Sequence, residues 1–140
     1  MSETAKVLMR DVVSVPSETT VTEVARIMKK ENIGSIFVGE KTRPDGIFTE
    51  RDLARKIVAE GLDPAVTPVS AAMTRKLISV ESSEPLSAVF RCLAKGQFRH
   101  LPITEGGLIV GIVSLTDLAK VLGEMADDEK YMRSFSEEMS

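Results

Sequence analysis

The feature that most constrains this chain is an internal repeat. Asp117 lies 65 positions after Asp52, and the same shift places Gly111 on Gly46. A single constant offset that runs through most of each half indicates two copies of one folding unit, which predicts a pseudo-symmetric pair and not a solenoid. Other pairs matched by this shift are Ser14 with Ser79, Val15 with Val80, Val24 with Val89, Ile47 with Ile112, Leu53 with Leu118 and Ala54 with Ala119.

Both copies contain the same order of predicted elements. In the first copy, Thr20 and Glu23 have capping-box spacing at the start of a helix whose apolar residues recur at helical intervals. In the second copy, Pro85 stands at the matching helix start and Gly96 is a stop signal. The predicted elements of the first copy are a strand over 12–15, a helix from Thr20, a strand over 35–38, a turn over 41–45, a strand over 46–49 and a helix over 50–60. Those of the second copy include hairpin strands at 101–103 and 111–114 and a helix over 115–124.

This β-α-β-β-α order predicts an α+β fold, in which short hairpin-linked strands form mixed sheets covered by helices. The stretch 61–70, which contains Pro64 and Pro68, is the predicted linker. The chain is therefore expected to divide into repeat one over 7–60, the linker over 61–70, repeat two over 71–124 and a C-terminal tail over 125–140.

The predicted tail has two interpretations. Methionines at positions 125, 132 and 139 continue a seven-residue period from Leu118, which favours a helix that packs on a dimer interface. Asp128 and the polar run around it interrupt this period, which equally favours a frayed tail.

Composition excludes several classes of function. The 140-residue chain carries 18 Lys and Arg against 21 Asp and Glu and has 4% aromatic residues, which argues against nonspecific nucleic-acid binding. Cys92 is the only cysteine and His100 the only histidine, so neither an internal disulfide nor a zinc site of spaced Cys and His ligands is available. Cys92 is interpreted as a small buried hydrophobic residue next to an apolar helical stripe.

The sequence also lacks the patterns of catalysis and of membrane insertion. We find no nucleophile-base-acid combination and no glycine-rich phosphate loop with its lysine, so the chain is expected not to be an enzyme and to have no metal and no cofactor. No apolar run approaches the roughly 20 residues that span a bilayer, and the N-terminus does not have the pattern of a signal peptide. A cytoplasmic protein without membrane attachment is expected.

The two copies share a motif that resembles a known family. Each contains the pattern Gly-hydrophobic-x-Thr/Ser-x-x-Asp, as Gly46-Ile-Phe-Thr49-Glu-Arg-Asp52 and as Gly111-Ile-Val-Ser114-Leu-Thr-Asp117. Together with Phe98-Arg-His-Leu-Pro-Ile103 and Asn32-Ile-Gly-Ser-Ile36 in matching places, the chain resembles a pair of CBS domains, named after cystathionine β-synthase, over residues 7–124. The resemblance implies two repeats packed across their sheets with approximate two-fold symmetry, two clefts that commonly bind adenosine-containing ligands, and a flat homodimer.

The repeated motif has chemistry suited to a ribose phosphate. It lies at a strand-to-helix junction, where unpaired backbone N–H groups and the helix dipole favour an anion, and Thr49 or Ser114 adds a hydroxyl. The carboxylate of Asp52 or Asp117 can accept hydrogen bonds from two vicinal ribose hydroxyls. The alternative is that both pairs are ordinary helix N-caps with an acidic residue in the first turn. The two interpretations are compatible in a ligand-free protein.

The resemblance implies further binding residues around each motif. The first-strand segments, Val12 and Val13 or Leu77 and Ile78, would hold the adenine. Arg99 and His100 stand where the family often places basic residues toward phosphates, whereas the matching Gly34 and Ser35 carry no charge. We therefore expect unequal clefts, with the stronger one built from Ser114, Asp117, Arg99 and His100. For Arg99 and His100 a solvated or structural role is the alternative, and Arg51 and Thr116, inside the motifs, are secondary candidates.

These observations lead to one functional prediction with two alternatives. The prediction is a regulatory module that binds AMP, ADP or ATP between its repeats, forms a homodimer and signals to a regulated protein that the sequence does not identify. The alternatives are a sensor of S-adenosylmethionine and a structural protein-interaction module with vestigial clefts. S-adenosylmethionine has no phosphate, so the basic pair favours a phosphorylated ligand.

Overall fold

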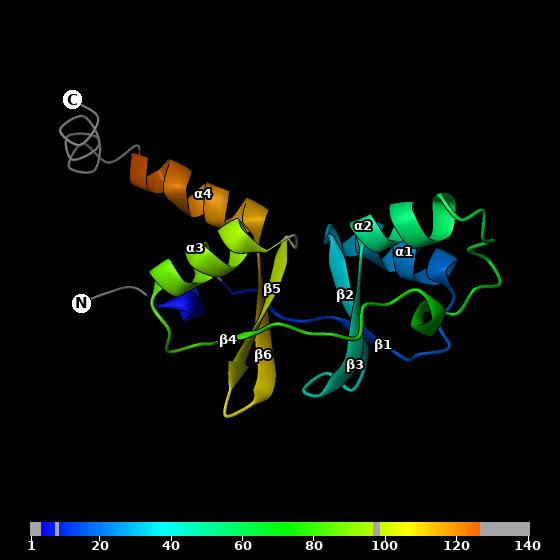
Figure 1. The fold of residues 1–140 in the computed structure, drawn as a ribbon, viewed down its shortest axis with the longest axis horizontal. Coiled ribbons are helices and arrows are strands. Elements are labelled where there is room, and N and C mark those ends of the chain that lie inside the picture. The colour runs from blue at the N-terminus through cyan, green and yellow to red at the C-terminus, as the bar shows by residue number, and fades with distance from the viewer. Residues whose placement is uncertain (1–3, 8, 97–98, 127–140) are drawn as a thin grey trace.

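The structure, a computed structural model, describes residues 4–7, 9–96 and 99–126. It consists of two similar halves that lie side by side (Figure 1). The first half contains β1 (Ser14–Val15), α1 (Val21–Glu31), β2 (Ser35–Gly39), β3 (Pro44–Thr49), α2 (Glu50–Asp52) and a π-helical continuation, η2 (Leu53–Val58). The second contains β4 (Val80–Glu81), α3 (Leu86–Lys95), β5 (His100–Glu105), β6 (Leu108–Ser114) and α4 (Leu115–Ala126). A short 3-10 turn precedes each half in the sequence: η1 (Ala5–Val7) and η3 (Val69–Ala71).

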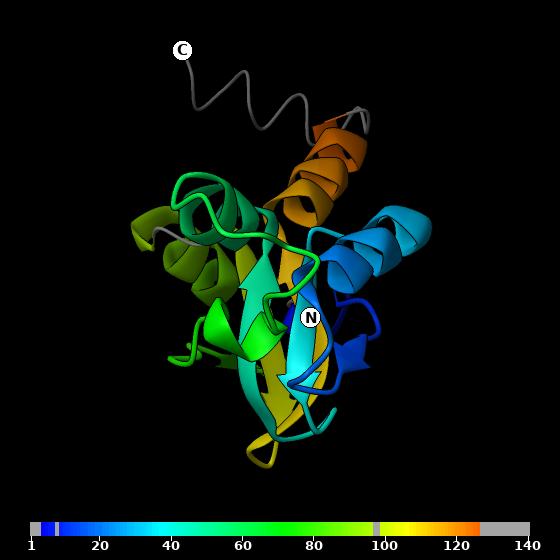
Figure 2. The same ribbon diagram turned by 90° about the vertical axis from the view of Figure 1, so that its right-hand side faces the viewer.

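The two sheets have the same topology. In each, the first strand pairs in parallel with the second, and the second pairs with the third in an antiparallel hairpin, giving the orders β1-β2-β3 and β4-β5-β6. The predicted α+β fold of two β-α-β-β-α repeats with mixed sheets is confirmed. Viewed along the line that joins the halves, the strands of one sheet lie in front of those of the other (Figure 2).

Local sequence signals explain the main helices. The Thr20 hydroxyl accepts a hydrogen bond from the Glu23 N–H at the start of α1, and Asn32 ends this helix in the left-handed conformation, which asparagine tolerates better than most residues. Gly96 ends α3 as predicted, and Pro85 is its N-cap, one residue before the first helical position predicted for it. α1 buries the predicted residues Val21, Val24 and Met28. α3 buries Val89 and Leu93, but Phe90 of its predicted stripe is exposed.

Several predicted elements differ from the observed ones. The hairpin strands are longer than predicted, since β3 begins at Pro44, β5 ends at Glu105 and β6 begins at Leu108. The first strand begins at Ser14 and not at Val12, because residues 9–12 run along the second half, where Arg10 pairs with Ile112. The single helix expected over 50–60 is a short α-helix followed by a π-helical segment, in which the Ala59 N–H donates to the Ala54 carbonyl. A π-helical turn is rare and frequently occurs at a functional site. Residues 127–140, most of the predicted tail, lie outside the described residues.

Side-chain alternation along the strands creates three apolar clusters. In β2, Ile36 and Val38 face the helices of the first half, whereas Phe37 faces the opposite sheet. The cluster between the sheets contains Val12, Phe37, Ile47 and Ile109. The central strands are therefore covered on both faces, by the helical core of their own half on one side and by the cluster between the sheets on the other.

Each half receives a segment from outside its own repeat. The N-terminal strap, residues 9–12, crosses to the second half, where Arg10 exchanges backbone hydrogen bonds with Ile112. The linker strap, residues 69–77, packs on the first half, where Thr74 exchanges backbone hydrogen bonds with Ile47. Figure 1 shows the two segments crossing between the halves in opposite directions. The core of the first half accordingly contains Val69, Ala72 and Met73, and that of the second contains Ala5.

These crossings explain the glycine of the repeated motif. A Cβ atom on Gly46 would lie 2.7 Å from the Thr74 carbonyl oxygen, and one on Gly111 would lie 2.7 Å from the Met9 sulfur. Real Cβ atoms do not approach other atoms this closely, so each strap can pair with its strand only where the side chain is a hydrogen atom.

We expect Gly46→Ala to lower the free energy of unfolding by about 1 to 3 kcal/mol, because the obstructing atom is a backbone oxygen. Gly111→Ala should have a similar cost, because its Cβ would lie 2.8 Å from Met9 Cβ, which the strap backbone holds in place. Gly123→Ala is the matched control: it lies in α4 with no atom within 4 Å of its would-be Cβ, and alanine there should raise stability by up to about 1 kcal/mol. Chemical denaturation would measure all three, and equal stability of the Gly46 and Gly123 variants would contradict the packing argument.

Candidate functional site

The two motifs form the same junction in each half. Thr49 ends β3 and caps α2: its hydroxyl accepts a hydrogen bond from the Asp52 N–H (3.2 Å), and its own N–H donates to Asp52 Oδ2 (3.0 Å). Ser114 ends β6 and caps α4 in the same way, with distances of 3.0 Å and 3.2 Å to Asp117. The expected N-cap geometry is therefore present in both copies, and the motif positions its aspartate at the first turn of a helix.

Asp52 is held by atoms from two segments. Its Oδ1 oxygen accepts a hydrogen bond from the Thr74 hydroxyl (3.1 Å) and forms an ion pair with Lys56 Nζ (3.0 Å). Lys56 also donates to the Thr74 hydroxyl and to the Met73 carbonyl. This network ties the linker strap to the first motif. Asp52 is 7% exposed, and these contacts satisfy its buried oxygens.

Asp117 is held by a different partner. Its Oδ1 oxygen lies 2.6 Å from Arg10 Nη2, and Arg10 belongs to the N-terminal strap. Asp117 is 8% exposed, and its other oxygen receives the Ser114 N–H. Each motif aspartate thus contacts the strap that crosses its own half.

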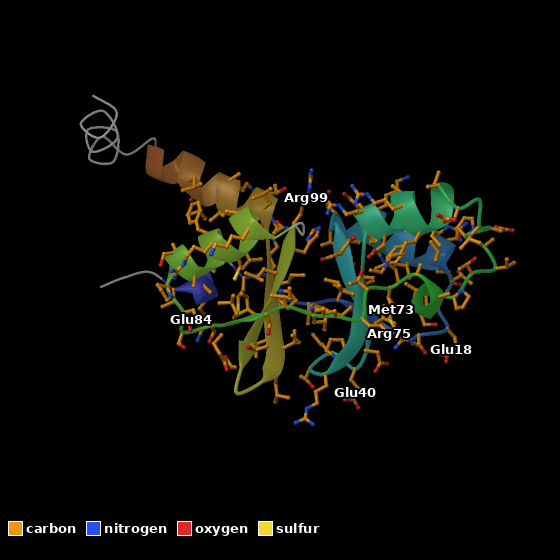
Figure 3. All side chains as sticks on the ribbon, in the orientation of Figure 1. Glu18, Glu40, Met73, Arg75, Glu84 and Arg99 are labelled. Carbon is orange, nitrogen blue, oxygen red and sulfur yellow. The ribbon has the colours of Figure 1, made fainter. Side chains whose placement is uncertain are left out.

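A cleft of about 560 Å³ lies at the first motif, within the size range of small-molecule sites. Residues of both halves line it, since the first half contributes Thr49 and Asp52 while the second contributes Arg99 and His100. Figure 3 labels Arg99 at the helix-bearing end of the space between the sheets. The remaining lining residues are Ile47, Glu50, Arg51, Arg55, Thr74, Lys76, Leu77, Ile78 and Pro102.

The lining combines an apolar surface with an excess of positive charge. Ile47, Leu77, Ile78 and Pro102 supply the apolar part. The charged lining consists of four cations, Arg51, Arg55, Lys76 and Arg99, against two carboxylates, Glu50 and Asp52. In a chain whose net charge is −3 this is a local concentration of positive charge, suited to an anionic ligand with an apolar portion.

His100 lies at the centre of the arrangement. Its ring is so close to Gly34 that a Cβ atom there would lie 3.0 Å from the imidazole Cε1 atom. Burial, helped by the nearby charge of Arg99, lowers the pKa of His100 below its ordinary value of 6.5, although the carboxylates of Glu50 and Asp117 oppose the shift. The imidazole is therefore neutral at pH 7 and adds no charge to the four cations of the ligand-free cleft.

The structure corrects the expected grouping of the basic pair. We expected Arg99 and His100 to form one cleft with Ser114 and Asp117, but their side chains line the cleft of Thr49 and Asp52. His100 does pair with Ser114 in the backbone ladder, and the Leu115 N–H donates to the Arg99 carbonyl. The side chains nevertheless reach the first half, where the His100 ring lies against Gly34.

The N–H groups expected to bind an anion already have partners. The Glu50 N–H donates to the Gly34 carbonyl, and the N–H groups of Thr49 and Asp52 donate within the cap. The matching groups of the second motif are used in the same way. Cationic side chains therefore replace backbone donors as the strongest available anion contacts in this cleft.

The other expected site residues lie in several environments. Arg51 lines the cleft of its own motif, whereas Leu77 and Ile78, expected at the second motif, line the cleft of the first. Val12 is buried between the sheets and Val13 packs partly against the first core. Gly34 lies against His100, Ser35 is buried opposite Thr49 in the strand ladder, and Thr116 is exposed in the first turn of α4.

Sequence reasoning missed several residues that shape the site. Arg55 could have been found, because it lies one helical turn after Arg51 and on the same face. Lys56 is likewise one turn after Asp52 and forms an i,i+4 ion pair. No local sequence pattern could have indicated Thr74 or Arg10 as site residues. Each contacts its aspartate only because its strap crosses to that half.

Neither a metal site nor a membrane span is found in the described part of the chain. No cluster of three or more His, Cys, Asp or Glu side chains there could hold a metal ion. None of the helices within these residues has the length and hydrophobicity needed to cross a bilayer.

Comparisons with known proteins agree with this geometry. The family model for the CBS domain matches residues 5–59 and again residues 69–124. The CBS domain-containing protein YhcV of Bacillus subtilis is 37% identical over 119 residues, covering 85% of this chain and 84% of that protein. A putative signal-transduction protein with CBS domains from Burkholderia ambifaria has a TM-score of 0.81 at 29% identity, over 90% of this chain and 96% of that one.

A solved structure of an uncharacterised conserved protein from Pyrococcus horikoshii is also similar, with a TM-score of 0.79 and 34% identity over 86% of this chain and 92% of that chain. The matched ranges of the family model fall on the two halves described above. This chain is a tandem pair of CBS domains and belongs to the CBS-domain family, whose paired domains are regulatory modules that generally bind adenosine ligands.

Proposed function

We propose that this protein is a sensor that binds an adenine nucleotide in the cleft at the first motif. The observation that carries the proposal is the composition of that cleft: a buried carboxylate, four cationic side chains and an apolar surface converge from both halves. A nucleotide has the matching parts, namely a ribose diol, a phosphate chain and an aromatic base.

Each part of the ligand has a chemically suited partner. The ribose hydroxyls can donate to the Asp52 carboxylate, in exchange with the Thr74 hydroxyl that now occupies Oδ1. The base fits the apolar surface of Leu77 and Ile78. Phosphates fit the cationic side chains, among which Arg55 and Arg99 are exposed and belong to different halves.

Binding in this cleft would couple to the arrangement of the halves. A nucleotide that contacts Asp52 in one half and Arg99 in the other favours whichever relative orientation brings both within reach. A regulated protein that contacts only that orientation would respond to nucleotide, by population shift. We further propose that the sensor acts as a cytoplasmic homodimer without its own catalytic activity.

One observation favours a second candidate, a protein-interaction module with vestigial clefts. Both carboxylate oxygens of each motif aspartate already have a partner among the described residues, so neither aspartate requires a ligand for stability. S-adenosylmethionine is a weaker candidate ligand than a nucleotide, because it has no phosphate to contact four cations.

Isothermal titration should show binding of AMP, ADP or ATP, with affinity increasing from AMP to ATP because more phosphate charge contacts more cations.

Arg99→Gln should weaken ATP binding by about tenfold, the loss of roughly one charge-assisted contact. Arg91→Gln, an exposed arginine of α3 outside the cleft, is the matched control. The absence of both heat and a melting shift with AMP, ATP and S-adenosylmethionine at millimolar concentration would reject the sensor and leave the interaction module.

The lowered pKa of His100 predicts a pH dependence of binding. An anionic phosphate stabilises the imidazolium, so the His100 pKa is higher in the complex than in the free protein, and binding takes up a proton. Affinity for ATP should therefore increase as the pH falls from about 8 to about 6.5, near the ordinary histidine pKa. Titration in buffers of different ionisation enthalpy would measure the proton uptake. His100→Gln should remove it, and equal uptake by this variant would assign the proton to another group.

A further inference from the structure

Arg10 occupies the carboxylate of the second motif. Its Nη2 atom lies 2.6 Å from Asp117 Oδ1, while Asp117 Oδ2 receives the Ser114 N–H. The Asp117 side chain is 9% exposed and that of Arg10 is 51% exposed, so the pair closes the carboxylate from the solvent side. A ribose diol directed at Asp117 would have to replace a charged partner.

The backbone holds Arg10 in this position. The Arg10 N–H donates to the Ile112 carbonyl (2.8 Å), and the Ile112 N–H donates to the Arg10 carbonyl (3.0 Å). The preceding Met9 packs on Gly111, where a Cβ atom would collide with it. Because the strap is fixed beside β6, the Arg10 side chain starts close to Asp117 and loses little freedom on pairing.

The first motif has a different arrangement at the corresponding place. The linker strap offers Asp52 a neutral hydroxyl, from Thr74, and the cation on Asp52 is Lys56 of the adjoining helix. Lys56 is also bound to the Met73 carbonyl and does not line the cleft. Arg75, labelled in Figure 3, aligns with Arg10 in the repeat. It forms no ion pair within the described residues.

We propose that Arg10 acts as an internal competitor that makes the second motif a latent, weaker nucleotide site. The first motif then binds nucleotide first, and a ligand reaches Asp117 only by displacing the Arg10 guanidinium from the strap. This inference rests on the proposed nucleotide binding, and it reverses the order of the two sites expected from the sequence.

The test isolates each motif in the full chain. With Asp52→Asn, only the second motif can bind ATP with its carboxylate, and adding Arg10→Gln should tighten binding there by about five- to tenfold, the effect of removing one partly exposed ion pair. With Asp117→Asn, the same Arg10→Gln change should leave ATP affinity unchanged. Arg75→Gln in the Asp52→Asn chain is the matched control and should have no effect.

Isothermal titration and thermal melting of each variant give distinct outcomes. If Arg10→Gln leaves the Asp52→Asn chain unchanged, or weakens its binding, Arg10 is not a competitor and the inference is overturned. If the Asp52→Asn chains bind no ATP at all while the unmodified chain does, the second motif is not a latent site, and the inference fails although the proposed function stands. Failure of the unmodified chain to bind any adenine nucleotide would instead reject the proposed function.

Discussion

The pairing of each strap with the opposite half is the contact on which the rest of the structure depends. Thr74 pairs with Ile47 and Arg10 pairs with Ile112, each beside a glycine that leaves room for the approach. Without these crossings the first core would lose Val69, Ala72 and Met73, and the second would lose Ala5. The apolar cluster between the sheets then fixes how the two halves face each other.

The same crossings give the motif aspartates two tasks. Each aspartate caps its helix through one oxygen and contacts the incoming strap through the other. A buried carboxylate with all these partners is stable without a ligand, which explains how the N-cap interpretation and the binding interpretation can hold for one residue. A nucleotide would compete for the oxygen that faces the strap, so ligand binding and strap position are linked by a single atom.

Pseudo-symmetry of the backbone does not produce symmetry of charge. The first motif meets cations from three places: its own helix, the linker strap and the end of the opposite sheet. The second motif meets Arg10, which neutralises its carboxylate directly. Position 121 is a valine where the first repeat has Lys56, so the two copies hold their aspartates by different means. A repeat can thus preserve a fold while its two sites diverge in chemistry.

The sequence alone determined the repeat, the α+β fold, the capped junctions and the two motifs, because these follow from local spacing within one repeat. Thr20, Pro85 and Gly96 set helix ends by contacts within a few residues. Tertiary structure decided which residues share a cleft: Arg99 and His100 pair with the backbone of one motif yet place their side chains at the other. The tertiary structure also decided that Thr74 contacts Asp52 and that Arg10 contacts Asp117. These contacts join segments whose proximity depends on chain crossings and on the packing of two sheets, and no local pattern encodes that proximity.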